Sequence, residues 1–330
     1  MKRIKLLPAL FLIVMLVGCG TSGSTGTTTR PDVKDKSISV VATIFPAYDW
    51  TRQIIGDQTD HTALTLLLDK GTDFHSYQPT VEDICKISSC DVFIYVGGES
   101  DKWVPDALAQ AENKDMVVVN LLEALGDAVK TEEAVEGMEH DGHDEHDEHE
   151  TEFDEHVWLS VRQAAVLCRV IRDALVQADP EHGAAYQANT AAYLEKLNAL
   201  DDAYTEALAA APRKTLLFAD RFPFRYLADD YGLTCYAAFS GCSAETEASF
   251  ETVNFLVGKV DELSLPYIMV LEGGDTRLAE TLISNSRDKN AEVLSLNSLQ
   301  TVTAQGVEDG ITYLGAMEDN LKALKTALGS

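Results

Sequence analysis

The chain is poor in basic residues and in long apolar runs. Its 330 residues include 26 Lys and Arg against 54 Asp and Glu, a formal net charge of −28 at pH 7. This excess argues against nucleic acid and anionic lipid surfaces as partners, because both repel negative charge. Outside residues 6–17 no segment is long and apolar enough to cross a bilayer, so we expect no transmembrane helix.

Common catalytic motifs are missing as well. The sequence has no Ser-His-Asp pattern, no glycine-rich phosphate loop and no HExxH helix, so we expect a protein that is not an enzyme. Its six cysteines include no CxxC spacing, which disfavours a zinc site built from cysteines.

The N-terminus has the pattern of an export signal. Residues 1–5 are basic and residues 6–17 mostly apolar, as in a secretory signal, which we assign to residues 1–18. The run ends in Leu-Val-Gly-Cys, which resembles a bacterial lipobox, so we expect cleavage before Cys19 and lipid on its thiol. An ordinary secreted protein with a chance cysteine is the alternative. The pattern predicts a lipid-anchored protein on the extracytoplasmic face of a bacterial cell membrane.

Residues 19–36 follow this signal and are rich in Gly, Ser and Thr. Such residues cannot pack into a core, so we expect a flexible tether between the lipid and the folded body. Disulfides are allowed in an exported chain. The short-range candidates are Cys85 with Cys90 and Cys235 with Cys242, which leaves Cys168 as a buried thiol.

A segment rich in histidine and acid occupies residues 131–155. Residues 132–155 hold 13 acidic residues and no basic one. Four of the chain's eight histidines recur there at every third position: His140, His143, His146 and His149. Imidazole and carboxylate bind divalent metals such as zinc, so we expect this loop to collect metal weakly. The alternative is a disordered acidic loop in which the histidines have no role.

Short apolar runs alternate with helical patterns along the rest of the chain. The expected strands are residues 37–43, 62–68, 91–96, 116–120, 215–219, 234–238, 267–271 and 292–296. The main helical patterns are residues 161–177, 182–211, 250–263, 277–286 and 317–328. This alternation predicts an α/β fold with parallel sheets covered on both faces. We expect two parallel-sheet lobes, residues 37–180 and 212–330, joined by one long helix over residues 181–211.

Polar side chains gather at the expected strand ends. Ligands in open parallel sheets sit beyond the carboxyl ends of the strands, so two lobes predict a ligand cleft between them. The residues at these positions are His75, His156, Asp220, Arg221, Glu272 and Asn297. A single histidine there is often structural, but two of them beside a His-rich loop favour a metal site.

Several motifs resemble the zinc- and manganese-binding lipoproteins that serve ABC importers. Residues 39–57 resemble that family's opening strand and helix. GTDFHSYQPTVEDI, around His75, resembles its first ligand motif, and DEHVWLS, around His156, resembles the second. YLADDYGL, which begins at Tyr226, resembles the segment after the third ligand. The resemblance covers nearly all of the chain after Cys19.

The chain departs from the family pattern at two ligand positions. The family's third histidine falls on Arg221, and an acidic position at a strand end falls on Asn297. The resemblance therefore implies His75 and His156 as ligands, with Glu272 as the third and Asp220 as a weaker candidate. Arg221 and Asn297 would lie beside the metal. Arg221 would pair with an acid such as Asp220 or Glu272, or neutralise a bound anion.

The resemblance implies a monomeric solute-binding lipoprotein that captures a divalent metal and delivers it to an ABC importer permease. Zn²⁺ is the expected ion, because Mn²⁺ prefers more oxygen ligands. Each histidine must be neutral to bind metal, so affinity should fall as the pH drops through about 6 to 7. The alternatives are a binding protein of the same fold for manganese, a metal chelate or another small solute, and a surface adhesin.

Overall fold

The structure, a computed structural model, describes residues 37–132, 135–138, 152–243 and 247–330. Several predictions fall outside these residues: the signal sequence, lipidation of Cys19, the tether, and the four histidines of the acidic loop.

The first sheet is parallel, with the strand order β2-β1-β3-β4. Its strands are β1 (Ile38–Ala42), β2 (Thr62–Leu66), β3 (Val92–Tyr95) and β4 (Val117–Asn120). The helices that connect and cover them are α1 (Phe45–Ile55), α2 (Val81–Ser89), α3 (Val104–Ala109), α4 (Leu121–Leu125) and α5 (Val161–Ala178). We call this part of the molecule the N-lobe.

The second sheet repeats this topology in the order β6-β5-β7-β8, again with parallel pairs. Its strands are β5 (Thr215–Phe222), β6 (Thr234–Ser240), β7 (Tyr267–Leu271) and β8 (Glu292–Leu296). Its helices are α7 (Arg225–Tyr231), α8 (Phe250–Leu263), α9 (Arg277–Asn285), α10 (Ala304–Glu308) and α11 (Tyr313–Leu328). We call this part the C-lobe.

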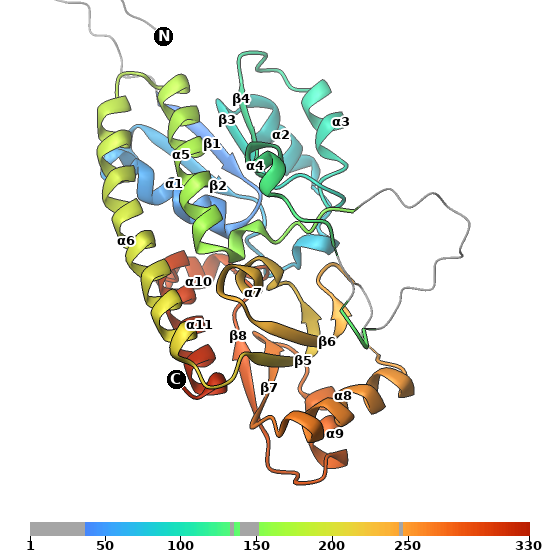
Figure 1. The fold of residues 1–330 in the computed structure, drawn as a ribbon. Helices are drawn as coiled ribbons and strands as arrows, with labels where there is room; N and C mark the ends of the chain where they lie inside the picture. Colours follow the sequence, from blue (N-terminus) through green and yellow to red (C-terminus); the bar gives the residue numbers. More distant parts are fainter. Residues whose placement is uncertain (1–36, 133–134, 139–151, 244–246) are drawn as a thin grey trace, which may run out of the picture. The chain divides into compact units, whose positions relative to one another are not determined.

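A single long helix, α6 (Gly183–Ala210), connects the two lobes. It runs along one side of both sheets, against α5 and α1 of the N-lobe and α11 of the C-lobe (Figure 1). The predicted architecture of two parallel-sheet lobes joined by one helix is therefore confirmed.

The lobes share a hydrophobic core. One cluster of buried side chains runs from Trp50 and Phe93 in the N-lobe to Phe218 and Met317 in the C-lobe. A second, smaller cluster lies under α8 and α9 on the C-lobe alone. Since burial of apolar surface is the main stabilising term in folding, a continuous core makes separation of the lobes costly.

Buried hydrogen bonds also cross the lobe boundary. The Trp158 indole donates to the Ser298 carbonyl at 2.9 Å, and the Tyr313 hydroxyl donates to the Trp158 carbonyl at 2.7 Å. The Asp49 carboxylate accepts the Tyr313 backbone N–H at 2.8 Å. These bonds fix the short Trp158 segment, which follows His156, against the C-lobe.

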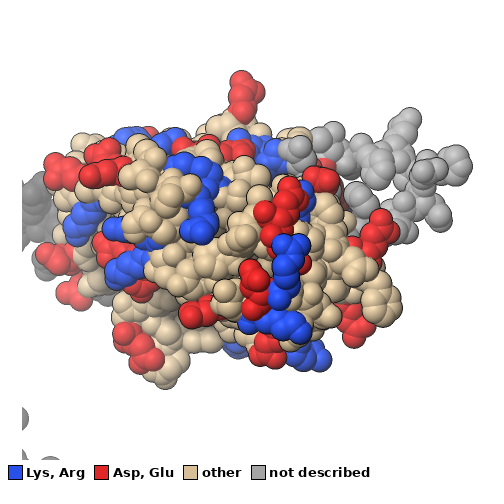
Figure 2. Space-filling view, turned by 60° about the horizontal axis from the view of Figure 1, so that its bottom comes forward, with Lys and Arg blue, Asp and Glu red and all other residues tan. Residues whose placement is uncertain are grey.

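Acidic and basic side chains are mixed on one face of the folded body. On the face drawn in Figure 2, Lys and Arg alternate with Asp and Glu rather than forming a broad area of one sign. None of the helices in the described part of the chain has the length and apolar character that a membrane span needs.

Neither of the two short-range disulfide candidates forms in the structure. Cys85, Cys90, Cys235 and Cys242 are all free thiols, and Cys168 is a buried free thiol. Cys85 is exposed on α2, whereas the buried Cys90 thiol lies against the Ile87 carbonyl at the end of that helix. Cys235 is buried in β6 and Cys242 lies in the loop beyond that strand.

Candidate metal centre

His75 lies in a short turn that follows β2. The turn is a single 3₁₀ segment, Phe74–Ser76, and the Asp73 carboxylate accepts the His75 backbone N–H at 3.0 Å to begin it. Farther on, Asp83 accepts hydrogen bonds from the Thr80 backbone N–H and the Tyr77 hydroxyl, which fixes the start of α2. The motif around His75 thus contains the residues that hold its backbone in place.

His156 begins a second 3₁₀ segment, Val157–Leu159, and its side chain is fully buried. Asp154 accepts both the His156 backbone N–H and its Nδ1, each at 2.9 Å. Ser160 then caps α5 by accepting the Gln163 N–H. The DEHVWLS motif therefore contains both a potential metal ligand, His156, and the residues that orient it.

The two imidazoles meet through their outer nitrogens. His75 Nε2 lies 3.0 Å from His156 Nε2. His75 Nδ1 faces Ser100 Oγ at 2.9 Å and the Glu155 carboxylate at 3.3 Å. Carboxylate partners on Nδ1 leave Nε2 free for metal and fix the ring orientation. Two nitrogens on one tetrahedral zinc are about 3.3 Å apart at ordinary bond lengths, close to the observed spacing.

Cys242 completes a group that the sequence did not predict. Among the described residues His75, His156 and Cys242 form the one set of three potential ligands, with ligand atoms within 4.8 Å of one another. Cys242 comes from the loop after β6. Gly241 lets that loop approach: a Cβ there would lie 2.9 Å from His156 Cε1 and 3.0 Å from the Phe222 carbonyl oxygen.

The Cys242 thiol lies in an environment that opposes its ionisation. Burial is the largest cause that raises its pKa, and the negative charges of Glu132, Glu155 and Asp154 raise it further. A thiolate is the form that binds metal. In the metal-free protein the thiol therefore keeps its proton at neutral pH, and a divalent cation would have to displace it.

Gln300 is a fourth polar side chain at this point. Its Nε2 lies 3.3 Å from His75 Nε2, and the residue is only 4% exposed. Its Oε1 is buried and has no hydrogen-bond partner among the described residues. The oxygen and nitrogen of a side-chain amide are told apart by their hydrogen bonds. A half-turn of the Gln300 amide exchanges the two atoms and would point Oε1 toward His75.

Glu272 and Asp220, the carboxylates that we expected as ligands, lie outside this group. Both Glu272 oxygens accept from Ser298, one from its N–H and one from its hydroxyl, each at 2.7 Å. Asp220 accepts the Arg221 and Leu271 backbone N–H groups. β5 has a register irregularity between Phe218 and Arg221, and these bonds satisfy backbone groups beside it.

The two altered family positions have other partners. Arg221 donates to the Asp73 carboxylate at 2.6 Å, so it pairs with an acid other than the two we named. Asn297 accepts the Leu299 N–H through its side chain, and its backbone is bonded to the Asn320 amide. Asn297 thus stabilises the turn that carries Gln300.

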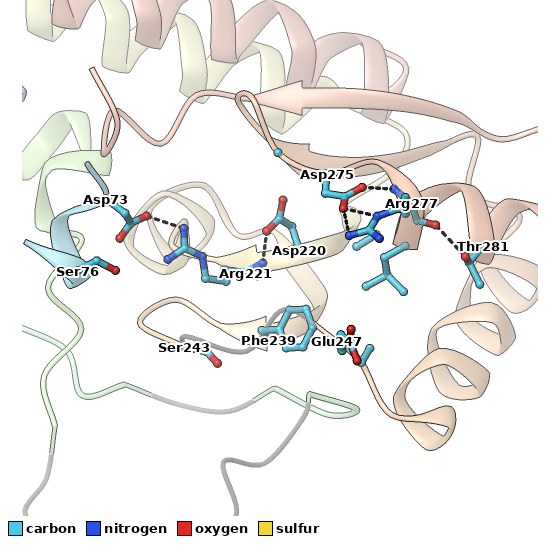
Figure 3. A pocket seen from close by; sticks show the side chains of 14 residues that line it. Asp73, Ser76, Asp220, Arg221, Phe239, Ser243, Glu247, Asp275, Arg277 and Thr281 are labelled. Carbon is cyan, nitrogen blue, oxygen red and sulfur yellow. Dashed lines mark hydrogen bonds and ion pairs between the residues drawn. The ribbon is translucent and has the colours of Figure 1, made fainter. Parts of the chain in front are cut away.

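A cavity of about 650 Å³ adjoins the group on the C-lobe side (Figure 3). It lies at the carboxyl ends of β5 and β6 and the start of α9. Arg221 and Asp73 occupy one end, and Arg277 pairs with Asp275 at the other. Its wall includes Asp73, two residues before His75, and Ser243, which follows Cys242.

Sequence reasoning missed Cys242 and Gln300. The absence of a CxxC spacing gave no reason to select Cys242, because the ligand group draws single residues from three distant segments. Gln300 lies three residues beyond Asn297, past the end of β8, where the strand pattern gives no signal. Leu299, with a φ of 60°, turns the chain between them in a left-handed conformation that is uncommon for leucine.

These observations define a two-lobed fold with a candidate metal-ligand set of His75, His156 and Cys242. The sequence profile of the family described as zinc-uptake complex component A, periplasmic (ZnuA), matches residues 40–327, and the chain belongs to that family. Members of this family are described as a component of an uptake complex, which agrees with our prediction that the protein is not an enzyme.

Individual relatives agree with this family assignment. The zinc-binding lipoprotein AdcA of Streptococcus pneumoniae serotype 4 is 35% identical over 325 residues, which are 98% of this chain and 61% of AdcA. The chain thus spans about three fifths of that relative. The high-affinity zinc uptake system protein ZnuA of Bacillus subtilis is 32% identical over 321 residues, 97% of this chain and 95% of ZnuA.

A solved structure shows the same fold. The crystal structure of Zn(II)-bound AdcA from Streptococcus pneumoniae superposes with a TM-score of 0.70 at 33% identity. The match covers 89% of this chain and 58% of that one.

Proposed function

We propose that this protein captures Zn²⁺ outside the cytoplasm and delivers it to the permease of an ABC importer. The observation that carries the proposal is the convergence of His75 Nε2 and His156 Nε2, 3.0 Å apart, each ring fixed on its other side by a carboxylate. Family membership and the similarity to the zinc-binding lipoprotein AdcA and the zinc uptake protein ZnuA support the same ion.

The proposed donor set is His75, His156 and Cys242. Two imidazoles and a thiolate suit the borderline-soft Zn²⁺ and are poorly suited to Mn²⁺, which prefers oxygen ligands. The fourth position would be taken by the Gln300 amide oxygen or by water. This set replaces the carboxylate ligands, Glu272 and Asp220, that the sequence favoured. Glu272 instead supports the Ser298 backbone on the turn that leads to Gln300.

The test is zinc titration of single-residue variants. His75→Ala and His156→Ala should each lower zinc affinity by about tenfold or more, since even the loss of a ligand's orienting partner has that effect. His61→Ala is a matched control, because that ring stacks on His182, away from the metal group. Competition against a fluorescent zinc indicator measures the affinities. Wild-type affinity in both ligand variants would exclude the site.

The acidic His-rich loop is proposed to concentrate Zn²⁺ near the site. Its base is closed by a bridge between Thr131 and Phe153. Beside that bridge the Glu132 carboxylate accepts the Cys242 backbone N–H at 3.1 Å. The described start of the loop therefore contacts the Cys242 segment, and we propose that His140 and His149 pass their metal to this segment.

The lipid anchor and the partner follow from the same proposal. A diacylglyceryl group on Cys19 would keep the protein near a membrane-bound permease. The description of AdcA as a lipoprotein supports this arrangement. We propose that the protein acts as a monomer, since a single chain contributes His75, His156 and Cys242.

A further inference from the structure

An ion pair joins the two lobes beside the metal-ligand group. Arg221, near the end of β5 in the C-lobe, donates to the Asp73 carboxylate in the N-lobe at 2.6 Å. Figure 3 shows the guanidinium reaching across one end of the cavity to Asp73. The side chains are 22% and 19% exposed, so the pair is shielded from much of the solvent.

Asp73 transmits this contact to a metal ligand. Its Oδ2 accepts from Arg221, while its Oδ1 accepts the His75 backbone N–H at 3.0 Å. The chain Arg221–Asp73–His75 therefore runs from a C-lobe strand to the turn that carries the histidine. His75 otherwise belongs to a segment with only one turn of 3₁₀ helix.

The geometry of β5 directs Arg221 toward this partner. The register irregularity after Phe218 changes which way the following side chains point, and Asp220 holds the altered backbone by accepting the Arg221 N–H at 2.8 Å. The Asp73 carboxylate thus pairs with the Arg221 guanidinium across the lobe boundary.

We infer that Arg221 is a positioning residue that holds the His75 turn against the C-lobe before metal arrives. This inference rests on the proposed zinc site. Arg221, which does not contact the metal, would then raise the affinity for zinc, because the His75 turn is already ordered in the free protein. An unpaired guanidinium near Zn²⁺ would repel it, and the pairing with Asp73 cancels most of that repulsion.

The test must break the ion pair without changing net charge. Asp73→Asn/Arg221→Gln removes both charges, and the amide at position 73 can still accept the His75 N–H. The matched control is Asp275→Asn/Arg277→Gln, which removes the other ion pair of the same cavity. Stopped-flow mixing of the full chain with Zn²⁺ and a chelator would give association and dissociation rate constants, with thermal unfolding as a check on the fold.

We expect zinc to dissociate about tenfold or more faster from the Asp73/Arg221 double variant, the range typical of groups that orient ligands. The control pair should keep wild-type rates. Arg221→Lys, which keeps a charge that can reach Asp73, should recover part of the loss. The Co²⁺ complex should keep the same ligand-field spectrum in all variants, because the ligands are unchanged.

Equal dissociation rates in the wild type and the Asp73/Arg221 double variant would overturn the inference while leaving zinc binding established. An altered Co²⁺ spectrum in that variant would also overturn it, since Arg221 or Asp73 would then act on the ligand set itself. If the wild type took up no Zn²⁺ at all, the proposed function would fail, and this inference with it.

Discussion

Cys242 changes the chemistry of the site at the scale of a single residue. Its pKa is raised by burial and then by nearby carboxylates, so the free thiol is protonated at neutral pH. Binding as thiolate must then release that proton. We predict that zinc binding by the wild type releases about one proton more than binding by Cys242→Ser.

Calorimetry in buffers of different ionisation enthalpy measures this release. Zinc affinity should also fall by about tenfold or more in Cys242→Ser, because a neutral hydroxyl is a much weaker ligand. Cys168→Ser, at a buried thiol outside the ligand group, is the control. Identical proton release in wild type and Cys242→Ser would remove Cys242 from the site.

The same residues show how far sequence could reach. His75 and His156 lie in compact motifs whose other members fix the local backbone, so each motif could be read from its own segment. Cys242 and Gln300 have no such local signal. They reach the site through a loop that needs Gly241 for its close approach and through the strained turn at Leu299. Both depend on tertiary contacts that no local pattern contains.

At the scale of elements, the turn after β3 carries a buried acid. The Asp101 carboxylate accepts the Val96 and Gly97 backbone N–H groups through one oxygen. Burial raises its pKa from 3.8 to about 7, and the charge of Glu155 adds to the shift. Because its pKa is higher in the folded state, Asp101 stabilises the fold at pH values below its pKa in the unfolded chain. This contribution is lost as the pH rises through about 7.

We therefore predict that the free energy of unfolding falls as the pH rises from about 4 to above 7, by a few kcal/mol at most from this group. Asp101→Asn should flatten that part of the profile, because its amide does not titrate and can still accept from Val96 and Gly97. Urea unfolding at pH 5 and pH 8 measures the difference. An unchanged pH slope in the variant would show that Asp101 is ionised in the fold.

The acidic His-rich loop is a separate element with its own test. Deletion of residues 131–152 should remove weak zinc equivalents and keep one tight equivalent, because the proposed ligands lie outside the deleted segment. Equilibrium dialysis against increasing Zn²⁺ counts both classes. Replacement of the four loop histidines by Gln keeps the loop length and serves as the control for a purely steric effect. Disappearance of the tight equivalent in both variants would place that site in the loop.

At the scale of the whole molecule, the order of strands and helices was predictable because parallel strands and their covering helices have strong periodic patterns. The strand spans agree within a few residues: β7 and β8 match the expected ranges, whereas β5 extends to Phe222, beyond the expected end at residue 219. That extension contains the irregularity at Asp220 and Arg221. Side-chain directions beyond it could not be read from alternation, which is why Asp220 and Arg221 have unexpected partners.

The continuous core and the bonds across the lobe boundary lead to a last prediction. Trp158 bonds to Ser298, Tyr313 bonds to Trp158 and Asp49, and α6 packs on both lobes. Opening the lobes widely would expose this core, so zinc should bind and leave through local shifts of the Cys242 loop. The radius of gyration from X-ray scattering should be the same, within the error of the measurement, for the metal-free and the zinc-loaded protein. Hydrogen exchange should slow on zinc binding mainly near residues 240–243. A larger compaction, with slower exchange spread along α6, would instead indicate hinge closure of the lobes around the ion.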